Sequence, residues 1–395
     1  MRIKVALFAL SAILYFANAA CAGESLAELS DRVFKLAKTQ SLGMLDALDK
    51  NGKAEMPKCI KNGKLETSGI TWWCSGFFPG TLWYIYEYDK DEKIKESAMR
   101  LTKALEPLIL EKTPTHHDIG FQINCSWGNA YSLTKDESLV PVIIAAADKL
   151  SKRFNPKVGA IKSWDWKGKY PVIIDNMMNL ELLCKASKIS SNPKYAELAK
   201  SHADTTIANH FRADGSSCHV VLYDTDSGKV LRRQTWQGLS DDSAWARGQA
   251  WGLYGCTMMY REIGDERYLK QAEKIARFIL NHKNLPSDKI PLWDFDAPKD
   301  ALRDASAGAI IASALLDLHK LTKDSELSKQ CLDTAETQIR TLASGEYLAQ
   351  AGTNCNFILK HSVGSLPQKS EVDTPLSYAD YYFLEALLKL GKLKN

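Results

Sequence analysis

The chain has 395 residues, of which 45% are hydrophobic and 25% are charged, and its formal charge is +4 at pH 7. Because Arg2 and Lys4 lie in an N-terminal segment that we expect to be removed, the remaining chain is close to neutral, which argues against nucleic-acid binding. No stretch after residue 22 is apolar enough to span a membrane, and the length fits two domains or one large helical barrel.

Residues 1–22 are typical of a signal peptide. A short basic start precedes an apolar stretch at 5–16, and small-x-small cleavage sites follow at 17–19 and 20–22. We therefore expect an exported protein, with the periplasm as its compartment. Cys21 offers a lipid anchor as an alternative, although Asn18 stands where such a signal usually has leucine.

Of the nine cysteines, eight follow Cys21 and are scattered, without a Cys-x-x-Cys pair or the ligand spacing of a zinc site. Cys59 and Cys74 are a candidate disulfide. Three others lie in apolar helical patterns and are expected to be buried free thiols: Cys184, Cys256 and Cys331.

Apolar residues recur at three- and four-residue steps over most of the chain, which predicts helices. Some of these helices carry Lys and Glu on their second face: 26–48, 94–110, 140–154, 195–211, 268–279 and 327–342. Others alternate with them and are apolar nearly all round: 77–88, 176–186, 248–260, 305–318 and 378–390. A helix that is apolar on every side is buried, and an amphipathic helix covers it.

The joints from each apolar helix to the next amphipathic one resemble one another. Each contains an Asp or Asn suited to cap the helix that follows: 88–93, 133–138, 190–195, 263–268 and 321–326. This internal repeat of inner helix, tight turn and outer helix predicts roughly six helix pairs. We therefore expect an all-α fold, an (α/α)6 barrel that residues 23–395 form as one domain.

The opposite ends of the inner helices differ from one another and are rich in aromatic, amide, glycine and carboxyl groups. They lie at 74–80, 116–120, 174–176, 240–245, 303–306 and 377–382. In a barrel these ends share one rim, and the longer excursions at 163–171 and 224–239 lie on the same side. Varied loops over a repetitive scaffold are where function is expected.

Two aspartates at this rim, Asp118 and Asp175, each precede an inner helix. Asp175 lies between the apolar residues 172–174 and Met177, in surroundings that raise a carboxyl pKa, and Asp118 follows two histidines. Helix capping is the ordinary role of a lone Asp in such a position. Since consecutive inner helices place the pair across one pocket, we interpret them as catalytic carboxyl groups for chemistry on a sugar.

The run 237–251 contains another helix start that is rich in charged and aromatic residues. Asp241 and Asp242 are suited to cap the helix that carries Arg247 and Trp251. Arg247 and Trp251 are four residues apart and share a helix face. Arg247 is either an ion-pair partner inside the barrel or a planar cation for a substrate carboxylate, with the indole beside it for a sugar face.

Other rim residues have a structural and a functional interpretation. His219 follows Asp214 and Gly215 and is either a core histidine or a ligand-binding one. The same holds for tryptophans that either pack or stack on sugars: Trp72, Trp73, Trp164 and Trp245.

Several of these motifs together resemble the unsaturated glucuronyl hydrolases of glycoside hydrolase family 88. The resemblance covers most of the chain, in family order, and rests on 73–83, 117–121, 174–176, 237–251 and 378–382. The run 237–251 is its most specific part. The family fold is an (α/α)6 barrel, which agrees with the repeat.

The resemblance implies a substrate and a reaction. The substrate is an oligosaccharide made by a polysaccharide lyase, typically from a glycosaminoglycan such as chondroitin, hyaluronan or heparin, with a 4,5-unsaturated uronic acid at its non-reducing end. Asp175 protonates C4 and then acts as base for the water that adds at C5, after which the hemiketal collapses and releases the next sugar. Asp118 orients the substrate and stabilises the developing cation. No metal or cofactor is required.

The resemblance also implies substrate-binding residues around the uronate and the sugar rings: Trp73, His117, His219, Gln237, Arg247 and Trp251, with Trp164 as a further stacking candidate. Ser362 and Ser365 match two positions of a Ser-x-x-Ser-x-Lys pattern that some members use to bind a sulfate. Pro367 replaces the lysine and Lys369 comes two residues late, so the chain departs from this pattern.

Two alternatives stay open. One is the related activity on unsaturated galacturonyl-rhamnose fragments of pectin, which shares fold and chemistry; the 245–249 run and the His117–Asp118 pair favour the glucuronyl branch. The other is an exported helical protein that binds sugars without catalysis. Such a protein has no need for two carboxyl groups at apolar helix starts.

Overall fold

The computed structural model describes residues 23–51 and 55–394, so the predicted signal peptide and the alternative lipid anchor at Cys21 lie outside the described residues. The outer helices are α2 (Leu26–Asn51), α4 (Glu92–Lys103), α7 (Val140–Ser151), α9 (Pro193–His210), α11 (Glu266–Leu280) and α13 (Ser325–Leu342). The inner ones are α3 (Phe77–Asp89), the segment α5–η2–α6 (Ile119–Ile123, Asn124–Gly128, Asn129–Thr134), α8 (Asn176–Ser190), α10 (Ala246–Ile263), α12 (Ala305–Leu321) and α14 (Ser377–Lys394).

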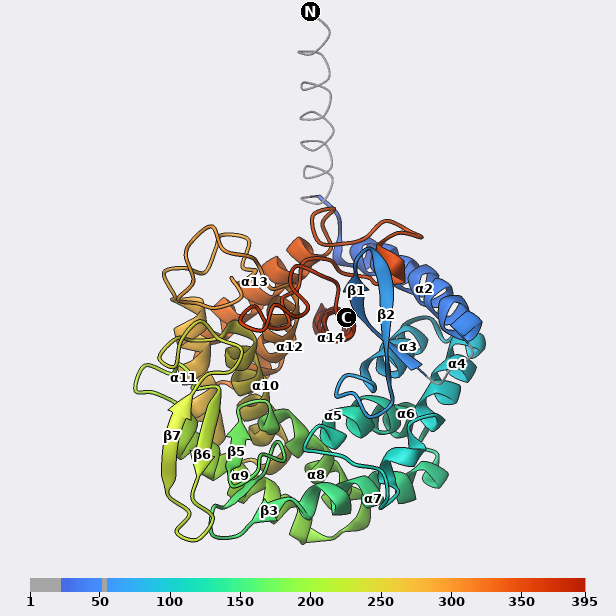
Figure 1. The fold of residues 1–395 in the computed structure, drawn as a ribbon. Helices are drawn as coiled ribbons and strands as arrows, with labels where there is room; N and C mark the ends of the chain where they lie inside the picture. The colour runs from blue at the N-terminus through green and yellow to red at the C-terminus, as the bar shows by residue number, and fades with distance from the viewer. Residues whose placement is uncertain (1–22, 52–54, 395) are drawn as a thin grey trace, which may run out of the picture.

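The inner helices form a closed ring. Each packs against the next in chain order, and α14 returns to pack against α3. The outer helices surround this ring (Figure 1). The (α/α)6 barrel predicted from the alternation of apolar and amphipathic helices is therefore confirmed, and its inner helices all begin at the same rim.

The tight joints also have the predicted capping. In each of the five joints, the side chain of an Asp or Asn accepts a backbone N–H at the start of the following helix. These residues are Asp91, Asp136, Asn192, Asp265 and Asp324. At Asp136 the helix that begins is the short η3 (Glu137–Leu139), which leads into α7.

Short strands at the rim were not predicted. A hairpin consists of β1 (Glu55–Lys61) and β2 (Lys64–Gly69), and β3 (Phe154–Asn155) pairs with β4 (Ala160–Ile161). A three-stranded antiparallel sheet contains β5 (Tyr170–Ile173), β6 (Val220–Tyr223) and β7 (Val230–Gln234). Two further short helices are η1 (Glu106–Ile109) and η4 (Asn354–Asn356). All four residues of β6 are buried, so they lack the alternation by which a strand is recognised.

The predicted disulfide between Cys59 and Cys74 is wrong. All eight cysteines of the described residues are free thiols. Cys74 is enclosed in the core, and Cys59 belongs to the β1–β2 hairpin. The expected buried thiols at Cys184, Cys256 and Cys331 are confirmed. None of the described helices is long and apolar enough to cross a bilayer.

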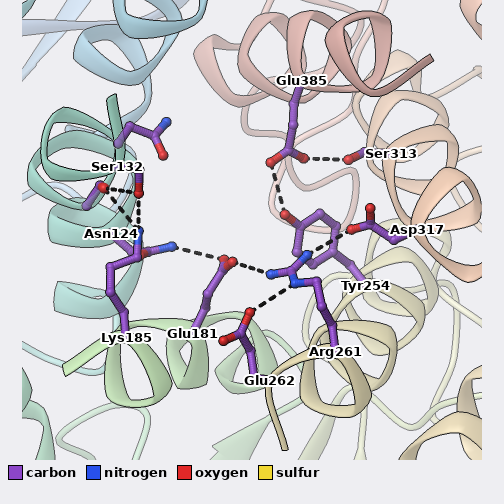
Figure 2. A network of polar contacts seen from close by, with 12 residues as sticks. Asn124, Ser132, Glu181, Lys185, Tyr254, Arg261, Glu262, Ser313, Asp317 and Glu385 are labelled. Atoms are coloured by element: carbon purple, nitrogen blue, oxygen red, sulfur yellow. Dashed lines mark hydrogen bonds and ion pairs between the residues drawn. The ribbon is translucent and has the colours of Figure 1, made fainter. Parts of the chain in front are cut away.

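A charged network ties four of the inner helices together away from the rim (Figure 2). Arg261 of α10 donates to Glu181 of α8 at 2.5 Å and to Asp317 of α12 at 2.8 Å. Lys389 of α14 also binds Asp317, at 2.8 Å. Glu385 accepts hydrogen bonds from Tyr254, at 3.0 Å, and from Ser313. Four inner helices are therefore joined by paired charged side chains. Removing one partner leaves an unpaired charge inside the barrel, which lowers the stability of the fold.

Arg261→Ala should destabilise the fold without slowing the chemistry. Removing the guanidinium leaves Glu181 and Asp317 without their shared partner, which should lower the free energy of unfolding by about 1–3 kcal/mol. Arg261 comes fourteen residues after Arg247 on α10, about 21 Å along the helix axis from the rim. Urea denaturation and kinetics on the same preparation measure both effects.

Arg267→Ala is the matched control, because the side chain of Arg267 is 60% exposed and pairs with Asp265 at the surface. Its loss should change stability by less than about 0.5 kcal/mol. Equal destabilisation by both variants would show that the network does not hold the helices together.

Candidate active site

A pocket of about 330 Å³ opens at the rim where the inner helices begin. Predicted site residues that line it are Trp73, His117, Asp118, Trp164, Asp175, Gln237, Arg247 and Ser365. The other lining residues are Trp72, Ile173, Trp236, Gly364, Gln368, Ser370 and Glu371. Segments far apart in the sequence thus meet at one cavity. This agrees with the prediction that the varied ends of the inner helices share one rim.

Both aspartates occupy the N-cap position of an inner helix, Asp118 before α5 and Asp175 before α8, yet neither side chain caps its helix. The two residues are only 6% and 8% exposed, and both line the pocket. Helix capping, the ordinary role of Asp in this position, therefore explains neither carboxyl group.

Asp175 is a buried carboxyl group that has no Lys or Arg ion-pair partner in the described part of the chain. It comes two residues after the end of β5, and its Oδ1 has no hydrogen-bond partner among the described residues. Burial raises the pKa of Asp175 to about 7; Arg247 opposes this rise, and Asp118 adds to it. A carboxyl group with such a pKa can both donate and accept a proton near neutral pH.

His219 lies beside Asp175 and presents one defined nitrogen to it. The Nδ1 of His219 accepts the backbone N–H groups of Trp236 and Gln237, each at 3.2 Å. This assigns the ring hydrogen to Nε2, which lies 3.7 Å from Asp175 Oδ1. Burial lowers the pKa of His219 well below its ordinary value, so the ring is a neutral donor.

Asp118 is held by the two histidines that precede it. His116 Nδ1 lies 2.8 Å from Asp118 Oδ2, and His117 Nε2 lies 3.4 Å from Oδ1. Burial alone would raise the pKa of Asp118, but the neighbouring histidines outweigh it, and the pKa lies below its ordinary value. The hydrogen bond with Asp118 raises the pKa of His116, whereas burial lowers that of His117 to about 4. The pocket therefore holds one ionised and one protonatable carboxyl group.

A close contact between α5 and α8 fixes the two aspartates relative to each other. Asn179 of α8 accepts the backbone N–H of Phe121 at 2.8 Å, and its amide lies 2.9 Å from His117 Nδ1. Gly120 allows this approach, because a Cβ atom there would lie 2.3 Å from the Asn179 side chain. The helices that follow Asp118 and Asp175 are thus locked together by one amide.

Arg247 is an ion-pair partner inside the barrel and also lines the pocket. Its guanidinium lies 3.4 Å from Asp304 and donates to the backbone carbonyl groups of Val363 and, at 2.6 Å, Gly364. It also lies over the Trp245 ring, 4.5 Å from the centroid. Arg247 lines the pocket despite these contacts. It is therefore a fixed cation whose position is set by the barrel.

Three predicted binding residues do not line the pocket. His219 lies behind Asp175, as described above. Trp251 is fully buried and packs against Phe121, with ring centroids 5.2 Å apart, so it cannot stack on a sugar. Ser362 is also fully buried, and its backbone pairs with Thr374. Trp251 points into the core because the helix face it shares with Arg247 is an inner face of the barrel.

Asp241 and Asp242 do not cap α10, contrary to expectation. The helix begins at Ala246, with Trp245 as its N-cap residue. Asp241 instead accepts the backbone N–H of Thr235 at 2.8 Å and pairs with Arg232. The two aspartates thus belong to the loop before the helix, which folds back on β7.

Several pocket residues were missed because no sequence motif marks them. Trp236 is 44% exposed and lies at the rim, one residue before the run that carried the resemblance. Gln368 donates to the Trp236 carbonyl at 2.8 Å. Glu371 belongs to an irregular loop after Ser365, and only the fold brings it to the pocket.

No group of three or more His, Cys, Asp or Glu side chains in the described part of the chain is arranged to hold a metal ion. The chemistry that this arrangement can perform is proton transfer by Asp175, beside an anion at Asp118 and a fixed cation at Arg247.

Comparisons with known proteins place the chain in a family. The family model described as Glycosyl Hydrolase Family 88 matches residues 47–316. An unsaturated glucuronyl hydrolase of Formosa agariphila is 46% identical over 327 residues, which cover 81% of this chain and 80% of the relative. An unsaturated chondroitin disaccharide hydrolase of Streptococcus pneumoniae is 33% identical over 332 residues, with 82% of each chain covered.

Solved structures extend the likeness to the whole fold. The crystal structure of an unsaturated glucuronyl hydrolase specific for heparin superposes with a TM-score of 0.87 at 49% identity, covering 92% of this chain and 98% of that one. With the matched family model and the pocket described above, these likenesses show that the chain is a glycoside hydrolase and a member of family 88, the family of the unsaturated glucuronyl hydrolases.

Proposed function

We propose that the enzyme removes a 4,5-unsaturated uronic acid from the non-reducing end of glycosaminoglycan oligosaccharides that a polysaccharide lyase has made. The observation that carries the proposal is the buried carboxyl group of Asp175, which faces a pocket together with the ionised Asp118 and has a pKa of about 7. Relatives named unsaturated glucuronyl hydrolase and unsaturated chondroitin disaccharide hydrolase support the substrate class.

The first step is protonation of the enol ether. Protonated Asp175 transfers its proton to C4 of the unsaturated uronate, and positive charge develops at C5 and the ring oxygen. The carboxylate of Asp118 stabilises that charge, which a neutral acid in its place would not. The Nε2–H of His219 faces Asp175 and stabilises the carboxylate that the proton transfer leaves behind.

The second step is the addition of water. The Asp175 carboxylate takes a proton from a water molecule as its oxygen bonds to C5, which restores the acid and forms a hemiketal. The bond between C5 and the ring oxygen then breaks, leaving a ketone at C5 and a hemiacetal at C1 that expels the next sugar. One water is consumed for each glycosidic bond cleaved, and a single carboxyl group serves as acid and base.

The remaining pocket residues bind and orient the substrate. We propose that Arg247 attracts the uronate carboxylate with a charge fixed by Asp304 and by backbone carbonyl groups. Gln237 is held toward the pocket by its bond to the Gly364 carbonyl, at 3.0 Å. Trp73 and Trp164, together with the exposed Trp72 and Trp236, offer ring faces to the sugars at the pocket mouth.

The two alternatives are less well supported. The relatives that match most of the chain are named for unsaturated glucuronyl or chondroitin substrates, which disfavours action on pectin fragments. A protein that only binds sugars gains nothing from a protonatable carboxyl group buried beside an ionised one, since that arrangement costs stability.

The direct test is a panel of lyase-generated disaccharides from chondroitin, hyaluronan and heparin, with an unsaturated galacturonyl-rhamnose disaccharide as the pectin comparison. Ultraviolet absorbance of the conjugated double bond should disappear with the glycosaminoglycan disaccharides as the next sugar is released. Turnover of the pectin fragment alone, or no turnover of any of them, would refute the proposal.

Asp175→Asn should abolish turnover while the fold persists. The amide has the same shape but cannot give or take the catalytic proton, and loss of a general acid/base costs roughly 10²–10⁴-fold in rate. Asp241→Asn is the control, because Asp241 lies at the same rim but does not line the pocket. The assignment fails if the Asp175 variant keeps roughly a tenth of the wild-type kcat, far more than this range permits.

The pH dependence of kcat/KM should fall on the alkaline side through the pKa of Asp175. The acid must be protonated, and because burial raises its pKa to about 7, activity is full below that value and declines about tenfold per unit above it. The pKa of Asp118 is lowered, so Asp118 stays ionised across the same range. A rate that keeps rising into the alkaline range would contradict Asp175 as the acid.

We also propose that the enzyme acts outside the cytoplasm. The support is the composition of residues 1–22, with a basic start, an apolar stretch and small residues at two cleavage sites. N-terminal sequencing of the protein secreted by its host should find a chain that begins close to residue 20 or 23. A blocked chain that begins at Cys21 would indicate a lipid anchor instead, and an intact Met1 would refute export.

A further inference from the structure

A second hollow, of about 440 Å³, adjoins the active-site pocket. Ser370 and Glu371 line both cavities, so the two are neighbours at this loop. Three lysines also line the second hollow: Lys58 and Lys61 from β1, and Lys369 from the loop. We call it the lysine hollow.

Positive charge is in excess there. Lys58 lies 3.0 Å from Glu66 and 3.6 Å from Glu371, and it is mostly buried. Lys61 is 71% exposed and reaches Glu66 only at 3.7 Å. Lys369 is exposed and forms no ion pair within the described part of the chain. Three ammonium groups thus line the hollow together with two carboxylates, those of Glu66 and Glu371.

Trp72 connects the pocket with the lysine hollow. Its ring is 40% exposed and lines the active-site pocket, and Lys58 Nζ lies 4.6 Å from the ring centroid. A sugar that leaves the pocket along Trp72 would therefore arrive beside the lysines. An indole with an adjacent ammonium group suits a sugar ring that carries an anionic substituent.

The loop after Ser365 carries its lysine at position 369, two residues later than the Ser-x-x-Ser-x-Lys pattern has it. Pro367 stands where a lysine near the pocket would complete the sulfate-binding pattern, and Lys369 lines the lysine hollow but not the pocket. Lys369 has a positive φ of 53°, which turns the chain at this point. The loop thus supplies its cation to the second cavity.

On the basis of the proposed function, we infer that the lysine hollow is a subsite for sulfate or carboxylate groups on the sugars that follow the unsaturated uronate. Substrates long enough to reach it gain ion pairs with Lys61 and Lys369 that a disaccharide lacks. The enzyme would then favour longer sulfated fragments over disaccharides, an effect that salt weakens.

The test compares a Lys61→Ala/Lys369→Ala double variant with the wild type. The substrates are an unsaturated disaccharide and an unsaturated tetrasaccharide from the same sulfated glycosaminoglycan. The double variant should keep kcat/KM for the disaccharide within about twofold and lose about three- to tenfold for the tetrasaccharide, since exposed ion pairs contribute modestly. The loss should lie in KM and should vanish at about 0.5 M salt.

Lys64→Ala is the matched control. Lys64 stands opposite Lys61 in the register of the same hairpin but does not line the hollow. A loss of the same size with Lys64→Ala, or an equal loss for both substrates, would overturn the inference. Calorimetry with the tetrasaccharide on Asp175→Asn, with and without the lysine substitutions, tests the subsite separately from turnover. Equal affinity in the two proteins would also overturn it.

Discussion

The proposed chemistry depends on one constraint, the burial of the Asp175 carboxyl group where no cation among the described residues is free to pair with it. Burial makes the charged form costly and raises the pKa to about 7. Arg247 is close enough to oppose this rise, but its guanidinium is already engaged by Asp304 and by the carbonyl groups of residues 363 and 364. A direct Arg247–Asp175 ion pair would hold the carboxyl group ionised and remove the proton that the chemistry needs.

The barrel keeps the pocket and the charged network that joins its helices at different levels along its axis. All inner helices begin at one rim, so loops of unrelated sequence meet at a single pocket. Away from the rim, Arg261 and its carboxylate partners join neighbouring helices with paired charges. The fold tolerates the cost in stability of an unpaired carboxyl group at the rim, because the ring is closed and its interior is well packed elsewhere.

Much of the fold could be predicted from the sequence, since a repeated helical pattern is a local signal. The apolar stretch 305–318 became α12, and the capping role of Asp265 or Asp324 follows from the residue alone. The strand β6 could not be predicted, because its four buried residues have no alternation. The second inner helix was expected after Asp118 but without bounds, and it is interrupted by the π-helical turn η2.

The site was predictable where a chemical group stands at a helix start, as at Asp118 and Asp175. It was not predictable where side-chain direction decides the outcome. Trp251 shares a helix face with Arg247, yet the indole is buried in the core while the guanidinium reaches the pocket. Trp236 and Glu371 come from an unmarked position and an irregular loop, so only the folded chain places them together.

The most direct measurement is a titration of the Asp175 carboxyl group itself. Carbon NMR of protein labelled at the aspartate carboxyl carbons, assigned with Asp175→Asn, follows that group without reference to any substrate. If Asp175 is the proton donor, the midpoint should lie near 7. A midpoint at or below the ordinary aspartate value of about 3.9 would show that the carboxyl group is ionised at neutral pH, and that Asp175 is not the proton donor.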